Sequence, residues 1–291
     1  RSSTMVTARH DKAMKDRATK QRMNPWVWKT WQERPYLTCE LIPQPHGFFT
    51  SHFYPHTPED LVEVIAPSAQ VYRVKQVHSA DVMTPDEIKN AIAAGLPTLP
   101  DGSPAPFPLA DGAISTQPQQ SVWACSADCT PALICDIMTG QVAAVHAGWR
   151  GTAQKILPIA VSRLLADGSD PKNLRIALGP AIDGQVYQVG KDVAMAVGIT
   201  VASPLSETGL ADAELIEQLS SVENPPILND EHPEKVRLDV RRINLMQLEQ
   251  MGLDAQQIAI APHCTYQDPD NFFSYRRTHE KKVQWAGIVS H

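Results

Sequence analysis

The sequence has neither a long apolar run nor an excess of positive charge. None of its hydrophobic segments approaches the roughly 18 consecutive apolar residues that a membrane-spanning helix needs, so we expect no membrane partner. The formal net charge is −6 over 291 residues, whereas a nucleic-acid-binding face needs an excess of Lys and Arg to neutralise phosphates. Both absences favour a protein that acts on a small molecule, and they leave room for a local basic pocket that binds an anion.

Cysteine is scarce, and its count is odd. Five cysteines in a long chain do not form a disulfide framework, which favours a reducing, cytoplasmic compartment. The cysteines are Cys39, Cys125, Cys129, Cys135 and Cys264.

The N-terminus also lacks the apolar core of a signal peptide. Residues 1–22 carry seven Lys or Arg residues and almost no large apolar side chain, so we expect a disordered basic leader, followed by a single domain over residues 23–291.

Periodicity predicts strands and helices in alternation. The apolar runs VWAC, ALIC and VAAV, between residues 122 and 145, are typical of short buried strands bounded by turns. A β-branched segment over 71–77 predicts another strand that ends at His78. The strongest helix is expected over 152–166, where apolar residues recur at helical spacing. No internal repeat or linker stands out, which favours one α/β-type domain.

Reactive side chains gather in and near the segment 125–155. His78, Cys129 and His146 each lie beside a predicted strand end, and a Cys/His/His set suits Zn²⁺ with a fourth position open for water or substrate. A second interpretation takes Cys129 as a nucleophile and His146 as its base, with Asp128 or Asp136 orienting the imidazole. A third takes them as one buried thiol and two unrelated histidines. Spacing alone leaves all three open.

The start of the 152–166 helix is a candidate anion-binding site, although an arginine at a helix start can also be simply solvated. Free backbone N–H groups and the helix dipole attract a phosphate or carboxylate there, and Arg150 adds a bidentate donor. Arg276 is a second candidate, although a pair of arginines such as Arg276 and Arg277 is also typical of a solvated or salt-bridged face. We expect Gln76, Arg150 and Arg276 to contact substrate.

Several segments taken together resemble one family. The sequences KQVH (75–78), DGA (111–113), ADCTP (127–131), VHAGWRGT (145–152), GP (179–180), CT (264–265) and FSYRR (273–277) occur here in the order found in the YfiH family, also called the laccase-domain or multicopper polyphenol oxidoreductase family. HAGWRGT together with ADC-x-P is the most specific part. The resemblance covers residues 46–291, and the sequence departs from the family pattern after Thr50, where Ser51 stands in place of an Arg.

The resemblance implies a fold, a metal site and an activity. The fold is α+β, with mixed sheets sandwiched between helices in an α/β/β/α arrangement, and the metal ligands are His78, Cys129 and His146. Family members are described as purine nucleoside phosphorylases that also cleave methylthioadenosine and deaminate adenosine. We therefore expect a monomeric zinc enzyme that converts adenosine, inosine, guanosine or methylthioadenosine with phosphate, in which Asp128 and Cys129 are catalytic.

Three alternatives remain open at this point. A copper-dependent, laccase-like polyphenol oxidase predicts bound copper and oxygen consumption with phenols. A metal-free Cys–His hydrolase predicts inactivation by thiol alkylation and indifference to chelators. A binding protein without catalysis, suggested by Ser51, predicts that nucleoside binds without turnover.

Overall fold

The computed structural model describes residues 24–202 and 211–291. The basic leader expected at residues 1–22 lies outside these ranges. Among the described residues no helix is both long and apolar enough to cross a membrane.

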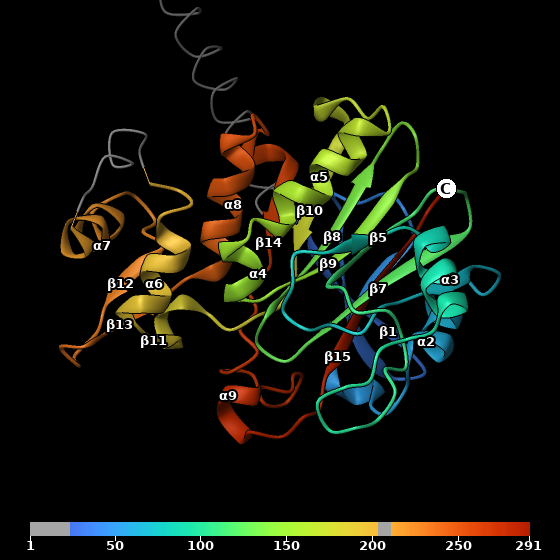
Figure 1. The fold of residues 1–291 in the computed structure, drawn as a ribbon, viewed down its shortest axis with the longest axis horizontal. Coiled ribbons are helices and arrows are strands. Elements are labelled where there is room, and N and C mark those ends of the chain that lie inside the picture. Colours follow the sequence, from blue (N-terminus) through green and yellow to red (C-terminus); the bar gives the residue numbers. More distant parts are fainter. Residues whose placement is uncertain (1–23, 203–210) are drawn as a thin grey trace, which may run out of the picture.

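Two six-stranded sheets form the body of the protein (Figure 1). In sheet order, the first consists of β1 (Trp26–Trp31), β2 (Arg34–Cys39), β3 (His46–Phe49), β15 (Gln284–Val289), β7 (Gln120–Ser126) and β4 (Gln70–Tyr72). The second consists of β14 (Ile258–Ile260), β10 (Leu174–Leu178), β8 (Thr130–Asp136), β9 (Val142–Ala147), β6 (Gly112–Ile114) and β5 (Val82–Met83). Both sheets are mixed, because β4 runs parallel to β7, β10 to β14 and β5 to β6.

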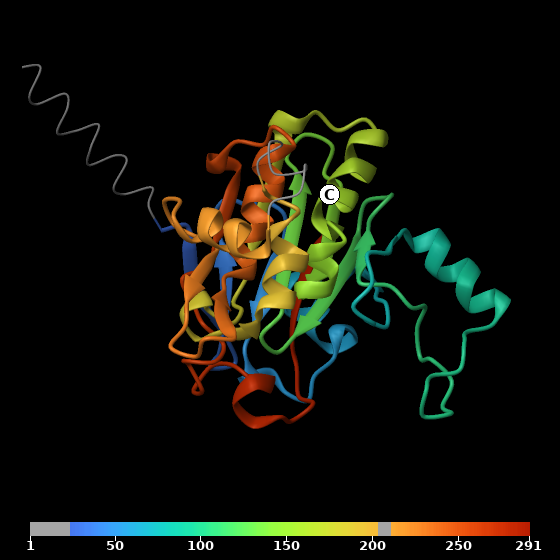
Figure 2. The same ribbon diagram turned by 60° about the vertical axis from the view of Figure 1, so that its left-hand side comes forward.

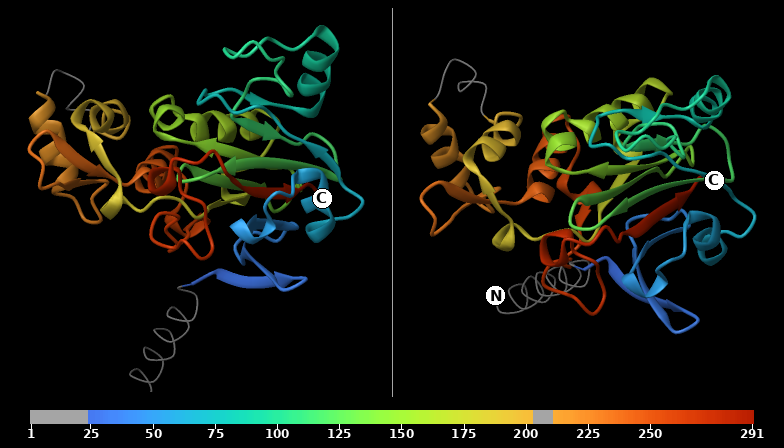
Figure 3. Two further views of the ribbon diagram at one scale, coloured as in Figure 1. Left: turned by 90° about the horizontal axis from the view of Figure 1, so that it is seen from below. Right: turned by 60° about the horizontal axis from the view of Figure 1, so that its bottom comes forward.

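The two sheets pack face to face, with β7 and β15 against β8 and β9. Successive strand residues point to opposite faces, so Leu133 of β8 lies between the sheets while Ile134 faces outward. Helices α5 (Ile156–Ala166) and α8 (Val240–Gln250) cover that outer face, and α2 (Pro58–Ile65) covers the outer face of the first sheet. This layering, which Figure 3 shows from two further sides, confirms the expected fold of mixed sheets between helices.

A smaller sheet forms a lobe beside the body, drawn in yellow and orange in Figure 1. It pairs β11 (Gln188–Gly190) and β12 (Ile227–Asn229) with β13 (Lys235–Leu238), and it packs on α6 (Lys191–Gly198) and α7 (Asp212–Ser220). On the opposite side, α3 (Pro85–Ala94) and the segment after it project from the body (Figure 2). That segment, 95–108, is a loop with one isolated bridge between Thr98 and Pro104.

The structure corrects two element boundaries next to the candidate site. The strand expected over 71–77 ends at Tyr72, and the chain then forms a loop in which His78 has a left-handed φ of 62°. The helix expected over 152–166 is broken into α4 (Trp149–Ala153) and α5. Pro158 lacks the N–H that a continuous helix would use and is tolerated only in a first turn. A new helix therefore begins at Ile156, after Lys155 at φ 60°.

His46, at the start of β3, is buried as a neutral imidazole. Its Nε2 accepts a hydrogen bond from the Cys39 backbone N–H (2.9 Å), and its Nδ1–H donates to the Gln44 carbonyl oxygen (2.8 Å). Burial lowers the pKa of His46 from 6.5 to about 4, although the hydrogen bond to Gln44 acts in the opposite direction. The unfolded chain takes up a proton near pH 6.5 and the folded chain only near pH 4. Stability that is present above pH 6.5 is therefore lost as the pH falls through this window.

The variant His46→Gln is expected to weaken the acid sensitivity of the fold, because it removes this proton uptake. Urea unfolding at pH 7.5 and pH 4.5 measures the effect. The loss of unfolding free energy between the two pH values should be about 2 kcal/mol smaller in the variant than in the parent protein. Exposed His232, replaced in the same way, should keep the parental loss. An unchanged pH dependence in His46→Gln would contradict the assignment.

Candidate metal centre

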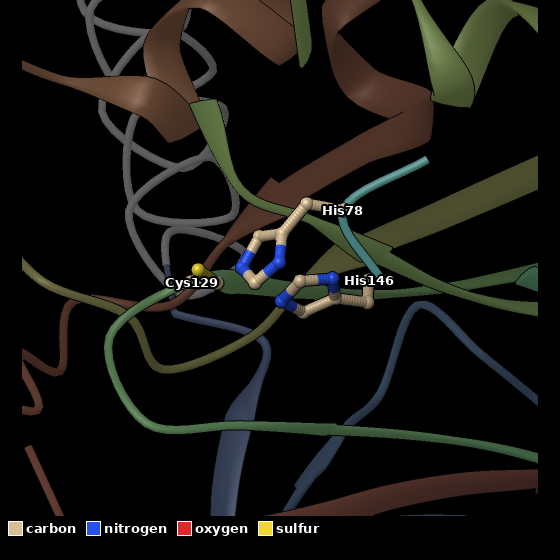
Figure 4. Close-up of side chains that lie close together, drawn as sticks. All are labelled: His78, Cys129 and His146. Atoms are coloured by element: carbon tan, nitrogen blue, oxygen red, sulfur yellow. The ribbon is translucent and has the colours of Figure 1, made fainter. Parts of the chain in front are cut away.

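His78, Cys129 and His146 meet at one end of the second sheet, although they come from three separate segments. His78 lies in the loop after β4, Cys129 immediately precedes β8, and His146 is the penultimate residue of β9. Antiparallel pairing of β8 with β9 places Pro131 opposite His146, which brings the turn before β8 next to the end of β9. One potential ligand atom from each residue lies within 4.8 Å of the others. Figure 4 shows the two imidazoles and the sulfur gathered around one point.

The imidazole of His146 is oriented by a buried carboxylate. Its Nδ1–H donates to Asp111 Oδ2 at 2.7 Å, and both side chains are almost fully buried. Burial would lower the pKa of His146, but the bonds to Asp111 and Cys129 outweigh it and raise the pKa to about 9. Because Nδ1 is engaged, Nε2 is the nitrogen left for a ligand, the arrangement found in most histidine metal sites.

Asp111 also fixes the loop that carries His78. Its carboxylate accepts hydrogen bonds from the backbone N–H groups of Val77 (3.0 Å), His78 (3.0 Å) and Ser79 (2.8 Å), and from the Ser79 hydroxyl (2.9 Å). Burial would raise the pKa of Asp111, but the bonds from His146 and from the backbone lower it. One carboxylate therefore positions both histidines. In the sequence, Asp111 belongs to the family segment DGA, where Asp-Gly is typical of a turn, and that pattern does not predict this role.

The Cys129 thiol is ionised at neutral pH and could therefore serve as a metal ligand. Burial would raise its pKa, but hydrogen bonding and charge from His146, followed by those from His78, lower it to about 6. Gly148 leaves room for the sulfur, because a Cβ at that position would lie 3.0 Å from Cys129 Sγ and 3.4 Å from His78 Cδ2. Burial instead raises the pKa of Cys125 and of Cys135 to about 12.

Asp128, which lines the same cavity as Cys129, holds the C-terminal segment. One oxygen accepts from the Thr265 hydroxyl (2.7 Å), and the other accepts from the Ser274 hydroxyl (3.0 Å) and the Arg276 backbone N–H (2.7 Å). Its φ of 100° is rare for a residue with a side chain. These bonds give Asp128 a positioning role, and its catalytic role stays a prediction. Asp136, the other carboxylate considered for His146, lies at the far end of β8, where it accepts from Ser169.

The three residues expected to contact substrate have different structural environments. The Gln76 amide is bonded at both ends to the Cys125 backbone, at 2.7 and 2.9 Å, so it joins the His78 loop to β7. Arg150 is exposed on α4, with its guanidinium 4.5 Å from the centre of the Trp149 ring. Arg276 is exposed in the short helix α9 (Tyr275–Thr278). Substrate contact by any of them remains a prediction.

Tyr187 is a further residue of this region that sequence analysis did not identify. Its ring lines a cavity of about 30 Å³ together with Cys129, Gly148 and Trp149. Burial and then the charge of Cys129 raise the pKa of Tyr187 to about 12, whereas the charge of Arg276 lowers it, so the phenol is protonated at neutral pH. It follows the short 3₁₀ turn Gly184–Val186, and nothing in that segment distinguishes it from an ordinary surface tyrosine.

The residues present fit a single transition-metal ion. One thiolate and two imidazoles are ligands that zinc and copper share. Three protein ligands leave a fourth position free, and His78 is on the exposed side of the group. Within residues 24–202 and 211–291 this is the only set of three or more His, Cys, Asp or Glu side chains placed to hold a metal.

The model of the multi-copper polyphenol oxidoreductase laccase family matches residues 59–290. The chain belongs to this family. It is 50% identical over 267 residues to a purine nucleoside phosphorylase of Synechocystis, with 91% of this chain and 97% of that protein covered. It is 30% identical over 211 residues to the purine nucleoside phosphorylase YfiH of Escherichia coli, which covers 72% of this chain and 70% of that protein. The family resemblance seen in the sequence is thereby confirmed.

Solved structures of family proteins share the fold. YlmD from Geobacillus stearothermophilus superposes with a TM-score of 0.70 at 22% identity, covering 92% of this chain and 100% of that one. YfiH from Bacillus licheniformis gives a TM-score of 0.68 at 20% identity, covering 91% and 99%. At this level of identity the likeness concerns the fold alone.

Proposed function

We propose that this chain is a zinc-dependent purine nucleoside phosphorylase. Its substrates are adenosine, inosine, guanosine and methylthioadenosine, and it deaminates adenosine as a side activity. The observation that carries the proposal is the group formed by His78, Cys129 and His146, whose ligand atoms lie within 4.8 Å of one another. The name of the Synechocystis relative, 50% identical to this chain, supports the reaction class.

The chain's own side chains supply ligation, orientation and charge. A zinc ion held by the three ligands would act as a Lewis acid toward an oxygen atom. Asp111 keeps both histidines in place, and the exposed guanidiniums of Arg150 and Arg276 attract phosphate. In phosphorolysis, a phosphate oxygen forms a bond to the anomeric carbon of the ribose. The N-glycosidic bond breaks, and its electron pair leaves with the purine.

A metal-free hydrolase is the second candidate, because the structure contains a Cys–His–Asp series. Cys129 is a thiolate, His146 is hydrogen-bonded to Asp111, and this is the arrangement of a nucleophile, a base and an orienting group. His78 argues against a hydrolase, because a Cys–His–Asp triad does not require a second imidazole within 4.8 Å of the sulfur. The copper alternative is weaker, because several copper centres need more ligand groups than the described residues provide.

Metal analysis combined with a nucleoside panel tests the proposal. The purified protein should contain stoichiometric zinc, and should convert nucleosides to free base and ribose 1-phosphate only when phosphate is present. A chelator should abolish turnover, and zinc should restore it. Metal-free protein that is fully active and is inactivated by iodoacetamide would establish the hydrolase instead. Bound copper with oxygen consumption on phenols would establish the oxidase, and nucleoside binding without conversion would show a binding protein.

The compartment and the oligomeric state belong to the same proposal. All five cysteines are free, which supports a reducing, cytoplasmic environment. The ligand group is complete within one chain, so a monomer suffices for activity.

A further inference from the structure

The cavity beside Cys129 contains a polar group that the proposed function does not yet use. Tyr187 is half-buried and lines it next to Cys129. A half-buried phenol that faces a cavity usually has a partner for its O–H. The cavity measures about 30 Å³, which is room for about two water-sized groups.

Tyr187 is held rigidly in this position. The Arg276 guanidinium carbon lies 4.9 Å from the centre of its ring. Arg276 is itself fixed twice, by its backbone N–H to Asp128 (2.7 Å) and by Nη1 to the Gln188 carbonyl oxygen (2.7 Å). The Tyr187 carbonyl oxygen accepts from the Leu238 backbone N–H at 3.0 Å. A group fixed through both its ring and its backbone loses little entropy when it binds a ligand.

Two guanidinium groups near the phenol favour an anion, and the opposing charge of Cys129 would be offset by a metal ion bound to its sulfur. Arg276 lies over its ring, and Arg150 also acts on it from the start of α4, where it is stacked on Trp149. Both guanidiniums are exposed and can approach a ligand from solvent. The nearby carboxylate of Asp128 does not oppose an anion strongly, because three hydrogen bonds occupy its oxygens.

We propose that Tyr187 is a phosphate-binding residue, whose hydroxyl donates to one phosphate oxygen in the cavity while Arg150 and Arg276 bind the anion at its mouth. The inference rests on the proposed function and deepens it by placing the phosphate. A cavity for two water-sized groups admits one oxygen and not the whole anion, so the remaining oxygens face the two guanidiniums.

The variant Tyr187→Phe tests the inference by direct binding. It keeps the ring that packs under Arg276 and removes only the hydroxyl. Inorganic phosphate titrated calorimetrically into the zinc-loaded protein should bind about tenfold more weakly to this variant, which corresponds to about 1.4 kcal/mol. Tyr275→Phe is the matched control, because Tyr275 is the neighbour of Arg276 but lies outside the cavity lining. Its dissociation constant for phosphate should equal that of the parent.

Steady-state kinetics separates this role from a structural one. In Tyr187→Phe the KM for phosphate should rise about tenfold, while the KM for nucleoside and the zinc content stay at parental values. Equal phosphate binding by parent and Tyr187→Phe, or a rise confined to the KM for nucleoside, would overturn the inference. If phosphate binding weakens as expected but the parent cleaves no nucleoside, the inference stands and the proposed function fails.

Discussion

Cys129→Ala is expected to remove both the metal and nucleoside turnover. The variant deletes the only anionic ligand of the group, and two imidazoles that remain without the thiolate hold zinc weakly. Loss of the Lewis acid withdraws several kcal/mol of transition-state stabilisation, which corresponds to a fall of about a thousandfold in kcat/KM. Elemental analysis and phosphorolysis assays on the same preparation measure the two effects together.

Cys125→Ala is the matched control for this experiment. Cys125 lies four residues earlier, on β7, and burial raises its pKa to about 12, so it carries no thiolate at neutral pH. This control should keep the parental zinc content and activity. Should Cys129→Ala retain full metal content and full turnover, the ligand assignment would be wrong. If it loses turnover in a protein that never held metal, the Cys–His hydrolase would be the better hypothesis.

The centre of the second sheet could be predicted from sequence because its strands are locally distinctive. The runs ALIC and VAAV are apolar at every position, and the structure buries both faces of the strands that contain them. β15 has no such signal, although it lies between β3 and β7 in the first sheet. Gly287 interrupts it, and glycine is unfavourable within a strand. Only the fold explains this glycine, because a Cβ there would lie 2.3 Å from the Trp123 ring.

The candidate metal ligands could be predicted from the sequence, because their side chains are reactive types. The residues that only position other side chains could not. His78, Cys129 and His146 are residue types that bind metals, and the family segments brought them together. Asp111 looks like a turn residue in sequence, and its contacts to His78 and His146 span 33 and 35 positions. Asp128 and Arg276 are 148 positions apart. Contacts between residues so far apart in the sequence arise from tertiary packing, so local sequence patterns do not predict them.

Asp111→Asn is expected to weaken metal binding and the fold together, without deleting any ligand. An asparagine can orient only one oxygen toward its partners, whereas Asp111 uses both oxygens to accept from four residues. Its amide N–H₂ would face either the His146 Nδ1–H or a backbone N–H, which places donor against donor. Loss of a carboxylate that orients a metal-binding histidine costs about 10- to 100-fold in metal affinity.

Two measurements on Asp111→Asn distinguish its effects. Competition with a chromophoric chelator gives the zinc affinity, and urea unfolding of the metal-free protein gives the stability. Removing one partner of a buried ion pair should lower the unfolding free energy by about 3 kcal/mol. Asp81→Asn is the control, because Asp81 is exposed and contacts Asp111 only through its backbone carbonyl oxygen. It should match the parent in both measurements.

Comparing the loss of zinc affinity with the loss of unfolding free energy shows whether Asp111 orients the histidines or only stabilises the fold. If it serves only the fold, zinc should rescue the variant fully, because a metal that binds the native state stabilises it by mass action. If it orients His146 and the His78 loop, the folded variant should still bind zinc at least tenfold more weakly than the parent, even at urea concentrations where both proteins are native. Parental zinc affinity in a destabilised variant would therefore contradict the orienting role. The structure predicts a weaker zinc affinity, because the same carboxylate contacts both histidine segments.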